Sequence, residues 1–131
     1  MKNPGLRYLL TMVLLFVGSQ STTRAYQPYR PTGEVVLTEK AFRHIVERHW
    51  PDSTAPGAGK FQQGITEDGL RILINEAVRN GHSRPNTNGR PGVIYEYDFR
   101  RQIGTNIDGQ PATRLRVVVN QRNQVVTAFP F

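Results

Sequence analysis

The spacing of apolar residues changes once along this 131-residue chain, and that change constrains the fold more than any other feature. Between about residues 38 and 80, apolar side chains recur three and four positions apart, which is typical of helices with one buried face. From Gly92 onward they alternate with polar residues, which is typical of strands. Helices followed by strands predict an α+β fold, with N-terminal helices packed on a C-terminal antiparallel β-meander.

Two helices are expected in the first half. Thr38 is a suitable N-cap for a helix that runs through Trp50, where Pro51 ends it. Thr66 is a suitable N-cap for a second helix that ends at residues 80–81, an Asn-Gly pair. The segments 52–59 and 82–91 are rich in glycine, proline and small polar residues and are predicted to be loops.

Three strands are expected in the second half, over residues 93–99, 113–119 and 124–129. Asp108 and Gly109 form a pair that is typical of a hairpin turn. In the last strand, strict alternation would place Thr127 on the same face as Val125 and Phe129.

The N-terminus indicates export. Residues 1–25 contain basic residues, then an apolar run over 9–17, then small polar residues ending at Ala25, which is the order of a secretory signal peptide. An uncleaved anchor is the alternative. The apolar run is too short to cross a bilayer as a helix, so we expect a secreted or periplasmic protein, with no membrane segment after cleavage. Residues 26–35 are predicted to be an extended lead-in and residues 36–131 a single domain, expected to be a monomer.

Composition removes several classes of site. The chain has no cysteine, which excludes thiol nucleophiles and cysteine-ligated zinc. It also lacks a His-Glu-x-x-His motif, so no metal site and no cofactor are predicted. Loss of Lys2, Arg7 and Arg24 with the signal peptide would lower the formal net charge from +7 to +4, which leaves a basic domain.

Two histidines lie on the first predicted helix. His49 falls within its apolar stripe, whereas His44 points to the opposite side. His49 is either a packed histidine held by a hydrogen bond or a general acid or base at the edge of the sheet. His44 is expected at the surface and is kept as a second candidate.

Other candidate residues are basic or carry a hydroxyl. Lys60 follows a glycine-rich loop, so its ammonium could stabilise the charge of a phosphoryl transition state, unless it is merely solvated. Thr127 interrupts an apolar strand and could bond a phosphate oxygen or be satisfied locally. Arg101, Arg114 and Arg116 could bind phosphates, with solvated strand arginines as the alternative.

Taken together, the His-Ile-Val-Glu-Arg-His-Trp segment at 44–50, the Gly-Lys-Phe at 59–61, the helix that follows and the Val-Thr-Ala-Phe-Pro at 126–130 resemble bacterial EndoU-like ribonuclease toxin domains. That group shares a fold with barnase, colicin and RelE-type ribonucleases. The resemblance spans about residues 36–130 and implies RNA as the substrate.

Carried over to this chain, the resemblance implies that His49 is the acid or base, that Lys60 lies near the second catalytic group and that Thr127 orients the phosphate. EndoU-like domains have a second histidine in a glycine-rich stretch, and residues 52–59 contain none here. Lys60 or His44 would have to replace it, or the site is inactive.

The leading hypothesis is therefore a secreted, metal-independent endoribonuclease of the toxin or effector type, which leaves a 2′,3′-cyclic phosphate. A toxin that acts in the cytoplasm would also require an immunity protein as a partner. The alternative is a non-catalytic, secreted basic module that binds an acidic polymer or a protein. A deoxyribonuclease of the same shape is a third possibility, which the lack of a metal motif disfavours.

Overall fold

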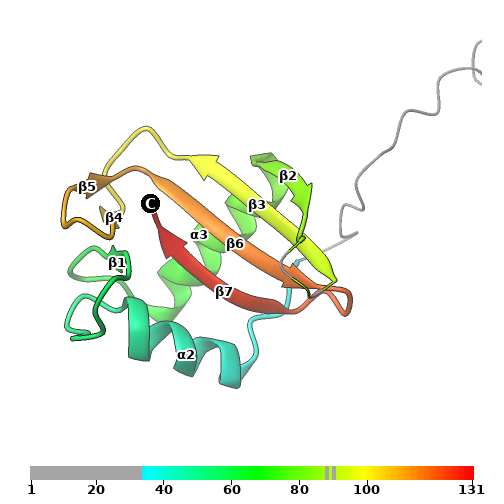
Figure 1. Ribbon diagram of the computed structural model, residues 1–131, viewed down its shortest axis with the longest axis horizontal. Helices are drawn as coiled ribbons and strands as arrows, with labels where there is room; N and C mark the ends of the chain where they lie inside the picture. The colour runs from blue at the N-terminus through cyan, green and yellow to red at the C-terminus, as the bar shows by residue number, and fades with distance from the viewer. Residues whose placement is uncertain (1–33, 88, 90) are drawn as a thin grey trace, which may run out of the picture.

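A computed structural model describes residues 34–87, 89 and 91–131 (Figure 1). The predicted signal peptide and most of the predicted lead-in lie outside the described residues. The elements, in chain order, are α2 (Glu39–His49), β1 (Lys60–Phe61), α3 (Glu67–Asn80), β2 (His82–Pro85), β3 (Gly92–Asp98), β4 (Gly104–Thr105), β5 (Pro111–Ala112), β6 (Arg114–Asn120) and β7 (Val125–Pro130). Two helices followed by antiparallel strands confirm the predicted α+β class.

Both helices begin where the sequence predicts, and α3 also ends there, whereas α2 ends at His49, one residue before the predicted end. The Thr38 hydroxyl accepts a hydrogen bond from the backbone N–H of Ala41 at 3.2 Å, and the Thr66 hydroxyl accepts one from Gly69 at 3.0 Å. These bonds satisfy backbone donors that have no partner inside the first turn of a helix. Each helix buries one apolar face. This face includes Ile45 in α2, and Leu70 and Ile74 in α3.

The main sheet has the strand order β2-β3-β6-β7, and all neighbours are antiparallel. Its first strand corrects a prediction, because residues 82–85 form β2 rather than part of a loop. This strand lies at the edge of the sheet, and three of its four residues are exposed. Without a buried face it shows no apolar alternation, which is the pattern on which a strand prediction depends.

A second, small sheet has the order β1-β4-β5. The predicted hairpin turn at Asp108 and Gly109 joins β4 to β5, in a loop that Asn106 closes by accepting hydrogen bonds from the backbone N–H groups of Asp108 and Gln110. The long strands β3 and β6 still pair directly with each other. The hairpin is therefore an insertion between β3 and β6, and it places β4 next to β1.

A β-bulge between β6 and β7 corrects the predicted faces of the last strand. Val119 pairs with Val125, but Val118 pairs with Thr127, so β7 carries one additional residue there. As a result Val125 and Ala128 are buried, whereas Thr127 and Phe129 are only half-buried. The extra residue moves Val125 off the face that Thr127 and Phe129 share.

The two helices are placed differently against the main sheet. α3 packs on one face, against β3 and β6, while α2 lies along β7 at the edge (Figure 1). The core contains Leu115, Val117 and Val119 of β6 on the α3 side. We refer to the opposite face, to which Arg114, Arg116, Thr127 and Phe129 belong, as the open face, since no described helix covers it.

Candidate active site

His49 is the only polar or charged residue that is fully buried among the described residues, with 6 % of its surface exposed. His49 is the last residue of α2. Its burial follows from its position within the apolar stripe of that helix. Its ring stacks on the ring of Phe129 in β7, with centroids 5.2 Å apart and planes at 22°. The helix and the sheet edge therefore fix the imidazole plane together.

The loop after α2 fixes the protonation pattern of this imidazole. Nδ1 of His49 lies 2.9 Å from the carbonyl oxygen of Gly59. A carbonyl oxygen only accepts hydrogen bonds, so Nδ1 must carry the proton and donate it. In the neutral ring Nε2 then has a free lone pair and is the basic atom.

Electrostatics favour the neutral ring. Burial is the largest effect and lowers the pKa of His49 below its ordinary value of 6.5. The hydrogen bond to Gly59 opposes this shift, whereas the nearby positive charges of His44, Arg48 and Lys60 add to it. The net lowering means that His49 is unprotonated at neutral pH, as a general base has to be.

His49 lines a cleft of about 480 Å³ between the end of α2, the loop before β1, the β4–β5 loop and the open face. The titratable side chains that line it are all basic, namely those of His44, Arg48, His49 and Arg116. Such a lining attracts anions. A volume of this size is typical of a ligand site.

His44 lies in the same cleft. It is exposed, as predicted, but its ring centroid is 6.0 Å from that of His49, and the two rings meet edge to face. A five-residue separation turns the two side chains apart by about 140° around the helix. Both nevertheless reach the cleft, because β7 and the loop bring its walls around the end of α2.

Thr127 also lines the cleft, and its hydroxyl is the least satisfied group there. The Oγ1 atom is buried and has no hydrogen-bond partner among the described residues. A buried hydroxyl without a partner destabilises the fold by about 1–3 kcal/mol, so its presence calls for a ligand atom that it can bond.

Arg116 is one of two arginines that line the cleft. One of its terminal nitrogens donates to Glu96 at 3.3 Å, while its Nε is buried and unpaired in the described structure. Burial tends to raise the pKa of Glu96, but hydrogen bonds from Arg84 and Arg116 outweigh it and hold that pKa low. The guanidinium also lies over the rings of Phe129 and Phe131, at 5.6 and 4.5 Å from their centroids. These contacts orient Arg116 and leave its Nε–H without a partner.

Lys60 is placed elsewhere. Its ammonium donates to the carbonyl oxygens of Arg48 and Ala55, at 2.8 and 2.7 Å, and to the hydroxyl of Ser53 at 3.3 Å. All three donor positions of the ammonium are thus engaged. Lys60 does not line the cleft. It holds the loop that carries Gly59 against the end of α2.

The other two predicted arginines do not meet His49. Arg114 stacks over the ring of Phe131 at 4.3 Å and lines a neighbouring cavity of about 330 Å³, while Arg101 lies near Ile65 and Leu73, beside a third cavity. Of the predicted site residues the cleft therefore unites His49, His44, Thr127 and Arg116.

Sequence reasoning missed four contributors. Arg48, Gly59, Phe129 and Phe131 all line the cleft, and Gly59 is the partner of His49. The position of Gly59, one residue before Lys60 in the motif at 59–61, was the available signal for it. A side chain at Gly59 would collide with the carbonyl oxygen of Pro130, so only glycine lets the loop approach β7 this closely.

Two further observations concern metals and membranes. Among residues 34–87, 89 and 91–131 there is no group of three or more metal-ligating side chains. Within the same ranges no helix is long and apolar enough to span a bilayer.

Comparison of the chain with protein-family models, with curated proteins and with solved structures finds no match.

Proposed function

We propose that this protein is a metal-independent endoribonuclease, which cleaves RNA by transesterification and leaves a 2′,3′-cyclic phosphate. The observation that carries the proposal is the hydrogen bond from Nδ1 of His49 to Gly59, which leaves Nε2 as a base in a cleft with basic walls. The resemblance to EndoU-like toxin domains supports the same reaction class.

His49 is the general base. Nε2 removes the proton from the ribose 2′-OH, and the resulting oxygen attacks the adjacent phosphorus. The lowered pKa of His49 keeps this atom free to accept a proton at neutral pH. Stacking on Phe129 limits rotation of the ring, so the base is oriented before the substrate binds.

His44 is the general acid, in the role for which the sequence left Lys60 as the other candidate. Its ring centroid lies 6.0 Å from that of His49, so both imidazoles can reach atoms of one phosphodiester that binds beside them. Lys60 is unsuited, since its ammonium already donates to one carbonyl oxygen of α2 and to two oxygens of the loop. His44 then protonates the departing 5′-oxygen, so one proton is taken up and one is released.

Thr127 and Arg116 bind the phosphate. The Oγ1 hydroxyl and the free Nε–H donate to non-bridging oxygens, where negative charge increases in the transition state. A positioned donor of this kind can contribute about 3 kcal/mol to transition-state stabilisation. Because both groups lack partners in the described structure, no existing hydrogen bond has to break when the phosphate arrives, but both atoms are buried, so the two side chains have to turn toward it.

The proposed biological setting is that of a secreted toxin or effector that acts on the RNA of other cells. It is supported by the N-terminal pattern of the sequence and by its positive charge. An immunity protein as a partner belongs to the same proposal.

The decisive experiment incubates the purified protein with total RNA in excess EDTA, beside His49→Ala and His44→Ala. We expect cleavage to cyclic-phosphate ends by the wild type, loss of about 10²–10⁴-fold in rate for each variant, and no dependence on metal. Circular dichroism of each variant establishes that it is folded. Intact RNA with the wild type would favour the non-catalytic binding module, in which His49 is only a packed residue.

A further inference from the structure

The active-site cleft continues along α2 as a longer trough. A second cavity, of about 410 Å³, lies between α2 and β7 and shares His44 and Thr127 with the cleft. A further cavity, of about 380 Å³, lies at the β6–β7 turn and is called the turn cavity below. It shares Asn120, Gln124 and Val126 with the cavity between α2 and β7. Shared lining residues mean that the three cavities are neighbours along β7.

One wall of this trough is a row of basic side chains. Lys40, His44 and Arg48 are spaced four residues apart, so they lie on one side of α2 at intervals of about 6 Å along its axis. Lys40 lines the second cavity, His44 lines both, and Arg48 lines the cleft. A row of regularly spaced basic side chains suits the repeated phosphates of a polynucleotide strand better than a single small anion.

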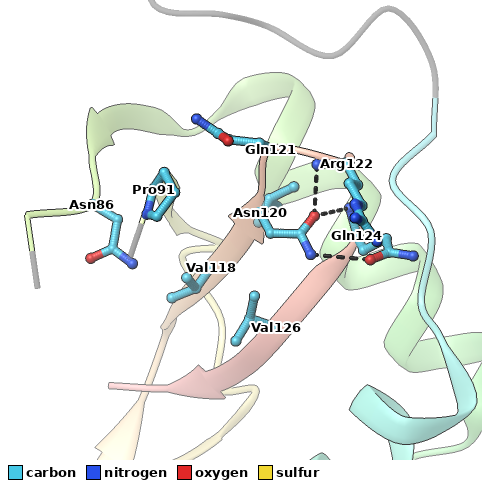
Figure 2. Close-up of a pocket in the computed structure, with 9 residues that line it drawn as sticks. Asn86, Pro91, Val118, Asn120, Gln121, Arg122, Gln124 and Val126 are labelled. Carbon is cyan, nitrogen blue, oxygen red and sulfur yellow. Dashed lines mark hydrogen bonds between the residues drawn. The ribbon is translucent and has the colours of Figure 1, made fainter. Parts of the chain in front are cut away.

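A fourth basic side chain lies at the end of the trough that is far from His49. Arg122 lines the cavity at the β6–β7 turn (Figure 2). Neither Lys40 nor Arg122 forms an ion pair with any residue that the structure describes. Both charges are therefore free to bind phosphate, unlike Arg43 and Arg71, which pair with glutamates on their own helices.

The floor and the turn offer contacts to bases. Val118 and Val126 both line the turn cavity and provide an apolar surface (Figure 2). The Asn120 carboxamide holds the turn, since its oxygen accepts from the N–H groups of Arg122 and Gln124 and its nitrogen donates to the side-chain oxygen of Gln124 at 3.1 Å. The side-chain nitrogen of Gln124 is left as a donor for a base edge.

We infer that this trough is an extended binding site for single-stranded RNA, in which Lys40 and Arg122 bind phosphates beyond the one that is cleaved. The six residues of β7 extend roughly 17–20 Å, which is room for about three phosphates at the interval of about 6 Å that the basic row of α2 sets. The scissile phosphate lies at Thr127, where the cleft and the trough meet. This inference rests on the proposed ribonuclease activity and adds its preference for long, unpaired substrates.

The test compares a decanucleotide with a dinucleotide, using the wild type and the double variant Lys40→Gln/Arg122→Gln. The ratio of kcat/KM for the decamer to that for the dinucleotide should fall about 5- to 30-fold in the double variant. The matched control is Arg71→Gln/Arg79→Gln, which removes two charges from α3, away from the trough, and should leave that ratio unchanged.

Binding supplies a readout that is independent of cleavage. In a His49→Ala background, the affinity for a labelled decamer should fall similarly, and the slope of log affinity against log salt should decrease by about 1.4, for two phosphates lost. A ratio, affinity and slope that match those of the control would overturn the trough. Cleavage of neither substrate by the wild type would overturn the proposed function instead, and the binding data would then decide the trough alone.

Discussion

The carbonyl oxygen of Gly59 accepts the Nδ1–H of His49 at 2.9 Å, across a loop of ten residues. This bond determines which imidazole nitrogen is basic and holds the ring against Phe129. It connects the end of α2 to the start of the small sheet. Lys60 also holds the loop to the helix, because its ammonium donates to the carbonyl oxygens of both Arg48 and Ala55. Four predictions follow from the groups around it.

Gly59→Ala should impair both stability and activity. The added Cβ would overlap with the carbonyl oxygen of Pro130, so the loop must move away from β7 and take the acceptor of His49 with it. We expect a loss of about 1–3 kcal/mol in the free energy of unfolding, and a drop in cleavage even under conditions where the variant is folded.

The comparator is Gly64→Ala. Gly64 has a φ of +86°, so alanine strains the backbone there, but no atom lies within 4 Å of the added Cβ. That variant should lose stability and keep the specific activity of its folded fraction. Equal activity in the two variants, measured at matched folded fractions, would argue against the loop as the orienting element.

Stability should depend on the ionisation of His49. Because its pKa is lowered in the folded state, the unfolded chain binds more protons as the pH falls below 6.5, and acid therefore favours unfolding. The wild type should lose stability relative to His49→Gln between pH 7.5 and pH 5, with a slope of at most about 1.4 kcal/mol per pH unit. Urea denaturation of both proteins across this range measures the two free energies of unfolding. If the stability of the wild type relative to His49→Gln stays constant or rises in acid, the pKa of His49 is not lowered.

Lys60→Met should reduce stability more than catalysis. The substitution removes one hydrogen bond to the carbonyl oxygen of Arg48 at the end of α2 and two to the loop, at a cost of about 1–2 kcal/mol. Thermal unfolding and kcat, measured well below the melting temperature, separate the two effects. Arg79→Met, on the exposed side of α3, is the control. A loss of activity of 10³-fold with little change in melting temperature would instead identify Lys60 as a catalytic residue.

Thr127→Val should increase stability while it reduces cleavage. The methyl group that replaces Oγ1 needs no hydrogen-bond partner, so the free energy of unfolding should stay the same or rise by about 1 kcal/mol. Loss of a phosphate donor should lower kcat/KM by about 10²-fold, whereas Thr127→Ser should retain most of the rate. If Thr127→Val loses stability and keeps its activity, the hydroxyl has a local partner and no role with phosphate.

The sequence by itself determined the helices and the class of fold. The Thr38 and Thr66 caps, the spacing of Ile45, Leu70 and Ile74, and the alternation after Gly92 depend on local hydrogen bonds and periodic burial, which neighbouring residues encode. The importance of His49 could be predicted for the same reason, because a histidine within an apolar stripe faces the body of the protein.

Only the tertiary structure decided how the site is assembled. The bulge that places Thr127 on the open face arises from the pairing of β7 with β6, which no local pattern records. Lys60 and His44 could not be ranked from the sequence, since their roles depend on where the loop folds back on α2. The partner of His49 is a backbone carbonyl, a group that every residue possesses, so only the path of the chain could reveal that it belongs to Gly59.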